Sequence, residues 1–99
     1  MASRGKKRGK VEGRLISVYA ATPIEYANLA MRRELMTYIS DGIAEGRLSR
    51  AQAARLFGVT QPRISNLMRG RVESFSIDSL VNMLGRQGMR VVVSFEAAG

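Results

Sequence analysis

Hydrophobic residues recur at helical spacing through the middle of the chain and predict a long first helix. The recurring residues are Met31, Leu35, Ile39 and Ile43, with Leu29 and Met36 beside them. Charged residues such as Arg32 fall between them and are expected to point away from the buried face. Pro23 suits a first helical turn, and Gly46 suits the left-handed position that follows a helix. We therefore expect a helix from about Thr22 to Glu45.

Two short helices are predicted next. Ser49 followed by Gln52 has the spacing of a capping box, which predicts a helix over residues 50–57. Thr60 can cap another helix, which we expect over residues 61–69. The residues expected to face inward from this second short helix are Ile64, Leu67 and Met68.

A further helix and a strand are predicted for the rest of the chain. Ser76 can cap a helix over residues 77–87, and Gly88 can end it. The expected buried residues of this helix are Leu80, Val81 and Leu84. Residues 89–96 alternate between apolar and polar side chains, which is the pattern of a β-strand, and residues 14–20 favour a short extended segment.

The charge of the chain is strongly positive and unevenly distributed. Sixteen Lys and Arg against eight Asp and Glu give a net charge of +8. Residues 1–14 carry six cations and one acid, and residues 47–71 carry six arginines and no acid. Solvated surfaces usually mix both signs, so these two basic zones indicate a polyanion as partner.

The basic N-terminus differs from the rest of the chain in composition. Residues 1–13 are rich in glycine and lysine and lack apolar periodicity, so we expect a disordered arm followed by one domain over residues 14–99. DNA, RNA and anionic lipid all remain open as partners of this arm. The arm residues expected to make contacts are Arg4, Lys6, Lys7, Arg8 and Lys10.

Several functional classes are disfavoured by the composition. Cysteine and histidine are absent, which excludes disulfides, thiol or imidazole catalysis and the usual zinc ligands. The carboxylates form no close pair or ligand cluster in the sequence, so no enzyme activity, metal or cofactor is expected. Apolar runs are shorter than the roughly 20 residues that a membrane span needs. We expect a cytoplasmic protein without membrane contact.

Residues 49–70 have the features of a helix-turn-helix unit. Two short helices flank a tight turn in which Gly58 can supply a positive φ angle. Ala54 is small where the helices must cross closely, and Val59 is apolar where the second helix rests on the first. A second short helix of this kind is the one that enters the major groove of DNA.

Three stretches of the chain are similar to one known family. They are QAARLFGVTQPRIS (52–65), LMRGR (67–71) and FSIDSLVNML (75–84). Together with the closing hydrophobic strand, they resemble the XRE family of λ-repressor-like helix-turn-helix proteins over about residues 24–96. Within this family, the chain resembles the antitoxin branch, whose members pair with RelE- or HigB-type toxins. It implies a mainly α fold, a λ-repressor-like bundle of about four to five helices with a C-terminal β-strand over residues 89–96.

Helix geometry and the resemblance together indicate which residues read DNA bases. If Ile64 and Leu67 face inward, steps of 100° place the polar residues of the helix on its outer side and flanks. A helix that enters the groove N-terminus first brings its first turn to the base edges. The expected base contacts are Gln61, Pro62, Arg63 and Asn66. Proline has no hydrogen-bonding side chain, so its expected contact is a thymine methyl group.

A second group of residues is expected to contact phosphates. The N-terminus of the helix over residues 50–57 has free N–H groups and a favourable dipole for an anion. The resemblance adds the residues that flank Gly70. The expected phosphate contacts are Ser49, Arg50, Gln52, Thr60, Ser65, Arg69 and Arg71. Arg55 lies on the far turn of its helix and is expected to be merely exposed.

The expected partners follow from the strand and from the resemblance. A lone terminal strand must pair its backbone, either with residues 14–20, with a second subunit or with a toxin. A symmetric homodimer would read a palindromic operator with recognition helices about 34 Å apart. The expected partner-strand residues are Val91, Val93 and Phe95. The resemblance also implies a cognate toxin and repression of the operon that encodes both proteins.

Two alternatives to the antitoxin remain open at this point. One is a stand-alone XRE or phage-type regulator that has no toxin. The other is a protein-interaction module whose helix-turn-helix serves only packing. A toxin-sized reading frame beside the gene separates the antitoxin from the first alternative, and affinity for DNA separates both regulators from the second.

Overall fold

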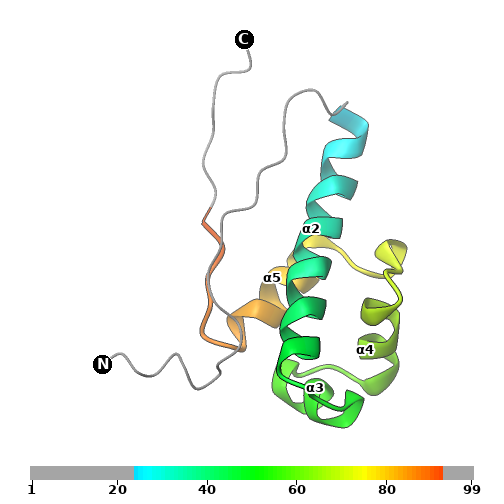
Figure 1. Cartoon of the computed structure of the whole chain (residues 1–99). Helices are drawn as coiled ribbons and strands as arrows, with labels where there is room; N and C mark the ends of the chain where they lie inside the picture. The colour runs from blue at the N-terminus through cyan, green and yellow to red at the C-terminus, as the bar shows by residue number, and fades with distance from the viewer. Residues whose placement is uncertain (1–23, 93–99) are drawn as a thin grey trace.

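The longest helix, α2 (Ile24–Glu45), packs against most of the other elements of the molecule. The computed structural model describes residues 24–92 of the chain. After α2 come α3 (Arg50–Phe57), α4 (Gln61–Met68), the 3₁₀ turn η1 (Val72–Ser74) and α5 (Ile77–Gly85). Figure 1 shows α3 and α4 near the C-terminal end of α2, while α5 crosses α2 nearer its middle. Over the described residues the chain is therefore mainly α, as expected from the sequence.

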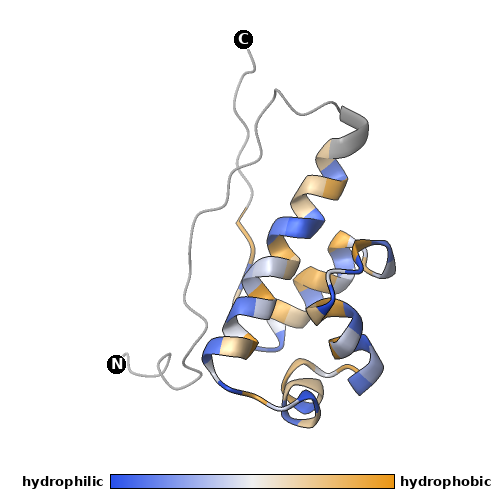
Figure 2. Cartoon of the chain, turned by 45° about the vertical axis from the view of Figure 1, so that its right-hand side comes forward, coloured by the Kyte–Doolittle hydropathy of each residue, from blue (hydrophilic) through white to orange (hydrophobic). Residues whose placement is uncertain are grey.

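One hydrophobic core joins all four helices of the described range. Its largest fully buried side chains are Ile39 of α2, Ile64 and Leu67 of α4, and Leu80 of α5. The core continues through Ala53, Ala54 and Phe57 of α3, so the two short helices are anchored to the same centre. In Figure 2 apolar and polar residues alternate along α2, as expected for a helix with one buried face.

The three shorter α-helices begin at the residues that the sequence predicts. Ser49 Oγ accepts from Gln52 N at 3.0 Å, and Gln52 Oε1 accepts from Ser49 N at 2.8 Å, which confirms the capping box. Thr60 Oγ1 accepts from Arg63 N at 3.3 Å at the start of α4. Ser76 begins α5 in the same way, with Ser79 as the reciprocal partner. These caps satisfy backbone donors that a helix start otherwise leaves unpaired.

The left-handed residue that follows each helix was predicted correctly for α3, α4 and α5 and wrongly for α2. Gly58, Gly70 and Gly88 each have a positive φ after α3, α4 and α5, as expected for glycines that follow a helix. After α2 the left-handed residue is Arg47, with φ 54°, rather than Gly46. Leu48 N donates to Ile43 O at 3.1 Å and Arg47 N to Ala44 O at 3.0 Å. This is the Schellman pattern with an arginine in the position where the other helices have glycine.

The buried faces of α2 and α5 and the end of α5 also differ from the sequence-based expectation. Met31 belongs to the predicted stripe, yet it is 36% exposed, because the core reaches α2 only from Leu35 onward. In α5 the buried residue beside Leu80 and Leu84 is Met83, while Val81 is half-buried. The helix ends at Gly85, two residues earlier than predicted, and a Schellman turn with Gly88 in the expected left-handed position follows it.

The predicted C-terminal strand is not formed over the part of it that the structure describes. Residues 89–92 have no regular secondary structure, and residues 93–96 lie outside the described range. The expected extended segment over residues 14–20 and the expected cap Thr22 also lie outside it, and the described helix begins at Ile24. Among residues 24–92, no helix is long and apolar enough to cross a membrane.

Replacing the left-handed arginine with glycine is expected to stabilise the fold. An L-residue with a Cβ in this conformation costs roughly 1–2 kcal/mol, part of which the extra freedom of glycine in the unfolded chain offsets. We expect Arg47→Gly to raise the free energy of unfolding by about 1 kcal/mol, measured by thermal or urea unfolding followed by circular dichroism. Arg47→Ala is the matched control, because it removes the side chain but keeps the strain. Equal stability of the glycine and alanine variants would contradict this account of the turn.

The glycine between α3 and α4 is expected to be required, whereas the glycine inside α5 is not. Gly58 has φ +71°, and a Cβ there would stand 2.7 Å from Cζ of Arg86. Gly85 has open space around it and ordinary helical φ. We expect Gly58→Ala to lower the free energy of unfolding by about 1–2 kcal/mol, and Gly85→Ala to raise it by roughly 0.5–1 kcal/mol. Similar changes in unfolding free energy for both variants would show that the turn conformation is unimportant.

Candidate nucleic-acid interface

Two buried aliphatic side chains determine which side of α4 faces the core. Ile64 and Leu67 are 0% and 1% exposed and lie in the core that α4 shares with α2, α3 and α5. The opposite side of the helix is therefore turned to solvent, as the sequence predicts. The residues on that side and its flanks are Gln61, Pro62 and Arg69, which are exposed, and Ser65 and Asn66, which are half-buried. Met68 was expected to face inward and is instead 38% exposed at the end of the helix.

Arg63 is placed differently from the other expected base contacts. Its Nη1 donates to the carbonyl oxygen of Ser74 at 2.6 Å. Its Cζ lies 4.2 Å from the centroid of the Phe75 ring, at cation–π distance. In this structure the guanidinium is thus directed at the segment between α4 and α5.

The expected phosphate contacts at the helix starts have atoms left for a ligand. In the capping box, Ser49 and Gln52 use their oxygen acceptors, so the Ser49 hydroxyl proton and the Gln52 amide group remain available as donors. The same holds for Thr60, whose oxygen accepts from the backbone of Arg63. Capping and phosphate binding are therefore compatible at these three residues.

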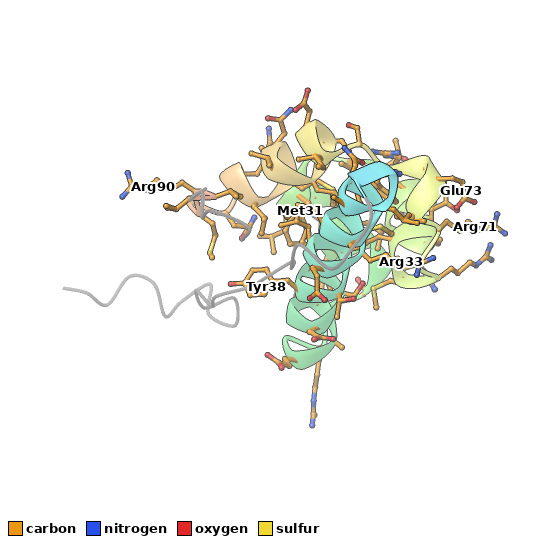
Figure 3. All side chains as sticks on the ribbon, turned by 90° about the horizontal axis from the view of Figure 1, so that it is seen from above. Met31, Arg33, Tyr38, Arg71, Glu73 and Arg90 are labelled. Atoms are coloured by element: carbon orange, nitrogen blue, oxygen red, sulfur yellow. The ribbon has the colours of Figure 1, made fainter. Side chains whose placement is uncertain are left out.

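Charge is segregated over the described surface. Residues 47–71, which include all of α3 and α4, carry six arginines and no acid. The acids of α2 at positions 34, 41 and 45 are exposed, and helical spacing places them together on the side away from the buried face. Viewed along the axis of α2 in Figure 3, Arg33, Arg71 and Glu73 lie to one side of this helix, and Met31, Tyr38 and Arg90 to the other. A polyanion is attracted to the α3–α4 side and repelled by the outer face of α2.

Arg32 is a residue of this region that the sequence analysis placed wrongly. It was expected to point away from the core, yet it is half-buried and donates from Nη1 to the carbonyl oxygens of Val72 at 3.0 Å and Phe75 at 3.3 Å. Its Nε donates to Asn28 Oδ1 at 2.6 Å. The signal was present in the spacing, because Arg32 precedes Met36 by four residues and so shares the buried side of α2.

The remaining expected contact residues are only partly covered by the structure. Arg50 and Arg71 are exposed at the start of α3 and after α4, where backbone contacts to DNA were expected. Val91 is 37% exposed at the end of the described range. The expected arm contacts, Arg4, Lys6, Lys7, Arg8 and Lys10, and the strand residues Val93 and Phe95 lie outside the described residues. Among residues 24–92, no group of three acids is placed to hold a metal ion.

A comparison with known protein families assigns most of the chain to one domain family. A family model described as a helix-turn-helix domain matches residues 21–96, which include every element that the structure describes. No curated protein matches the chain significantly. The unit formed by α3, Gly58 and α4 lies within the matched residues. The chain therefore belongs to the helix-turn-helix domain family, a class of DNA-binding regulators.

Proposed function

We propose that the chain is a sequence-specific repressor of transcription that binds double-stranded DNA. The observation that carries this proposal is the outer side of α4, where Gln61 and Arg69 are exposed, together with a complete absence of acids from Arg47 to Arg71. An acid on this surface would stand opposite a phosphate and repel it. The buried contacts of Ile64 and Leu67 hold this polar side outward.

In the proposed complex, α4 enters the major groove with its N-terminus first. Gln61 and Asn66 can each pair with an adenine through two hydrogen bonds, and Pro62 can contact a thymine methyl group. Arg63 is the fourth proposed base-contact position, and its guanidinium has to leave Ser74 O if it is to reach a guanine. The first two turns of α4 are therefore the proposed source of sequence preference.

Phosphate contacts hold the protein in register on the duplex in this proposal. Ser49, Gln52 and Thr60 offer the donors that capping leaves free, and two cationic groups flank Gly70 at the end of α4. The full proposed set is Ser49, Arg50, Gln52, Thr60, Ser65, Arg69 and Arg71. Such contacts fix orientation and contribute affinity that falls with salt, without distinguishing sequences.

We further propose a homodimer that reads a palindromic operator. Val91 and Val92 are 37% and 80% exposed at the end of the described range, and they belong to the segment 89–96 whose alternation favours a strand. Pairing with the same segment of a second subunit would cover these side chains. Two copies of α4 would then lie about one turn of the duplex apart.

The finer proposal is that the chain is the antitoxin of a type II toxin–antitoxin pair and represses its own operon. Its support is the resemblance of residues 52–84 to the antitoxin branch of the XRE family. Expression of a toxin-sized neighbouring gene, alone and together with this chain, tests it by cell growth. Growth arrest that this chain relieves supports the antitoxin. A harmless neighbour, or none, leaves a stand-alone regulator.

The DNA-binding proposal predicts sequence preference that depends on α4. Fluorescence anisotropy would compare DNA from upstream of the gene with scrambled DNA of equal length at several salt concentrations. We expect at least about 1000-fold tighter binding of the upstream DNA near physiological salt. Asn66→Ala should lower specific affinity by roughly 1–3 kcal/mol, about fivefold to 150-fold, with little effect on scrambled DNA.

The matched control for this prediction is Arg55→Ala, which removes an exposed cation outside the proposed contact set. It should weaken binding to both DNAs slightly and equally, through net charge alone. Equal affinity of the wild type for both DNAs, collapsing as salt rises, would contradict sequence-specific recognition. A protein-interaction module would show no useful affinity for either DNA.

A further inference from the structure

We infer that Arg32 and Arg63 act together as positioning residues for DNA binding, because they hold the turn that carries Arg71. This inference rests on the proposed function, and it concerns how the DNA-binding surface is kept in shape. The two guanidiniums and the backbone carbonyls of Val72, Ser74 and Phe75 are called the arginine clamp below. For Arg63 this inference replaces the base contact proposed above: its guanidinium stays on Ser74 O, and Gln61, Pro62 and Asn66 are left to contact the bases.

The clamp joins α2, α4 and η1, and Arg32 lies 40 and 43 residues from the carbonyls that it contacts. Arg32 comes from α2 and bonds the carbonyl oxygens of Val72 and Phe75 at 3.0 and 3.3 Å. Arg63 comes from α4 and bonds the carbonyl oxygen between them, that of Ser74, at 2.6 Å. Three carbonyls of one short turn are thus held from two helices. Hydrogen bonds with an ionised donor are about twice as strong as neutral ones.

Besides the clamp, the turn is held by backbone hydrogen bonds from Ser74 N to Arg71 O and from Phe75 N to Val72 O, and by Val72, which packs against the core. η1 is only three residues long, none of them is buried, and its first residue has no side-chain cap. A 3₁₀ turn has poorer hydrogen-bond geometry than an α-helix and is weak in isolation. Its one buried neighbour is Phe75, which is 3% exposed and lies under the Arg63 guanidinium. Loss of Arg63 would therefore remove both a hydrogen bond and the cover of this ring.

The turn matters because Arg71 stands at its start. Arg71 is exposed and is the residue immediately before Val72, whose carbonyl accepts from Arg32. In Figure 3 Arg71 and Glu73 project outward from the turn. Holding the carbonyls of this turn fixes the backbone from which Arg71 reaches a phosphate. Arg63 thereby contributes to binding through Arg71.

A scan of the operator separates positioning from base reading. Each base pair of the upstream DNA would be substituted in turn, and affinity measured by anisotropy for wild type, Arg63→Ala, Arg32→Ala and Arg71→Ala. A base-reading arginine relaxes preference at one position when it is removed. We expect Arg63→Ala and Arg32→Ala instead to weaken binding to every sequence by a similar factor of about ten, with the profile across positions unchanged.

The salt dependence and a double-mutant cycle test the link to Arg71. Removing one phosphate contact lowers the slope of log affinity against log salt by about 0.9. We expect this reduction for Arg71→Ala and also for Arg63→Ala and Arg32→Ala. Each double variant with Arg71→Ala should lose far less affinity than the product of the two single losses, because both changes remove the same contact. A purely structural role would leave the losses multiplicative.

Two controls make these results interpretable. Arg55→Ala removes the same charge from an exposed position and should leave the slope close to that of wild type. Arg32→Lys and Arg63→Lys keep the charge but replace the planar fork with a single ammonium group. If an alanine variant does not fold, as judged by circular dichroism, its lysine variant takes its place. Lysine variants should then show a smaller uniform loss.

The outcomes distinguish failure of this inference from failure of the proposed function. Wild-type protein that does not prefer the upstream DNA overturns the proposed function. Wild-type preference combined with an Arg63 variant that loses selectivity at a single base pair overturns the clamp and assigns Arg63 to base reading. An Arg32 variant that binds all the DNAs as wild type does also overturns it.

Discussion

Burial of Ile64 and Leu67 is the contact on which the candidate interface depends. These side chains come from α4 and are almost completely excluded from solvent, together with Ile39 and Leu80. Burying a side chain of this size stabilises the fold by about 1.5–3 kcal/mol. Because a helix has a fixed angular spacing, this burial also decides that Pro62, Arg69 and their neighbours face outward. Stability and the orientation of the polar side of α4 therefore have the same cause.

The distribution of charge favours one side of the molecule for contact with DNA. The arginine-rich, acid-free segment is the one that contains α3 and α4, while the exposed acids of α2 gather on its outer face. Such a separation favours approach of a polyanion from one side of the molecule. The capping residues of α3 and α4 add donors on that same side without giving up their structural role. Local backbone chemistry and long-range charge thus favour one binding surface.

The features that the sequence predicted well are those that depend on residues close together in the chain. Capping at Ser49 and Thr60 and the positive φ of Gly58 involve contacts within a few residues, and all of these were predicted. The buried stripe of α2 was predicted from Leu35 onward for the same reason. Helix starts, turns and buried faces are largely local consequences of side-chain type.

The features that the sequence missed depend on which distant segments come together. Arg32 bonds carbonyls 40 and 43 residues away, and no spacing rule predicts the partner of a single arginine. Arg63 was placed from helix geometry alone, and the position of Phe75 beside it follows from the path of the next segment. Arg47 takes a left-handed conformation that favours glycine, because the Schellman hydrogen bonds of Arg47 and Leu48 that follow α2 place the left-handed position one residue after Gly46.

The most direct measurement of the central claim is an NMR titration of the labelled protein with DNA from upstream of its gene. The account predicts that backbone amide signals from the first turns of α3 and α4 and from residues 69–75 shift strongly. Signals from residues 34, 41 and 45 on the outer face of α2 should stay nearly unchanged. Strong shifts on that outer face, with the first turn of α4 unaffected, would contradict α4 as the DNA-reading helix.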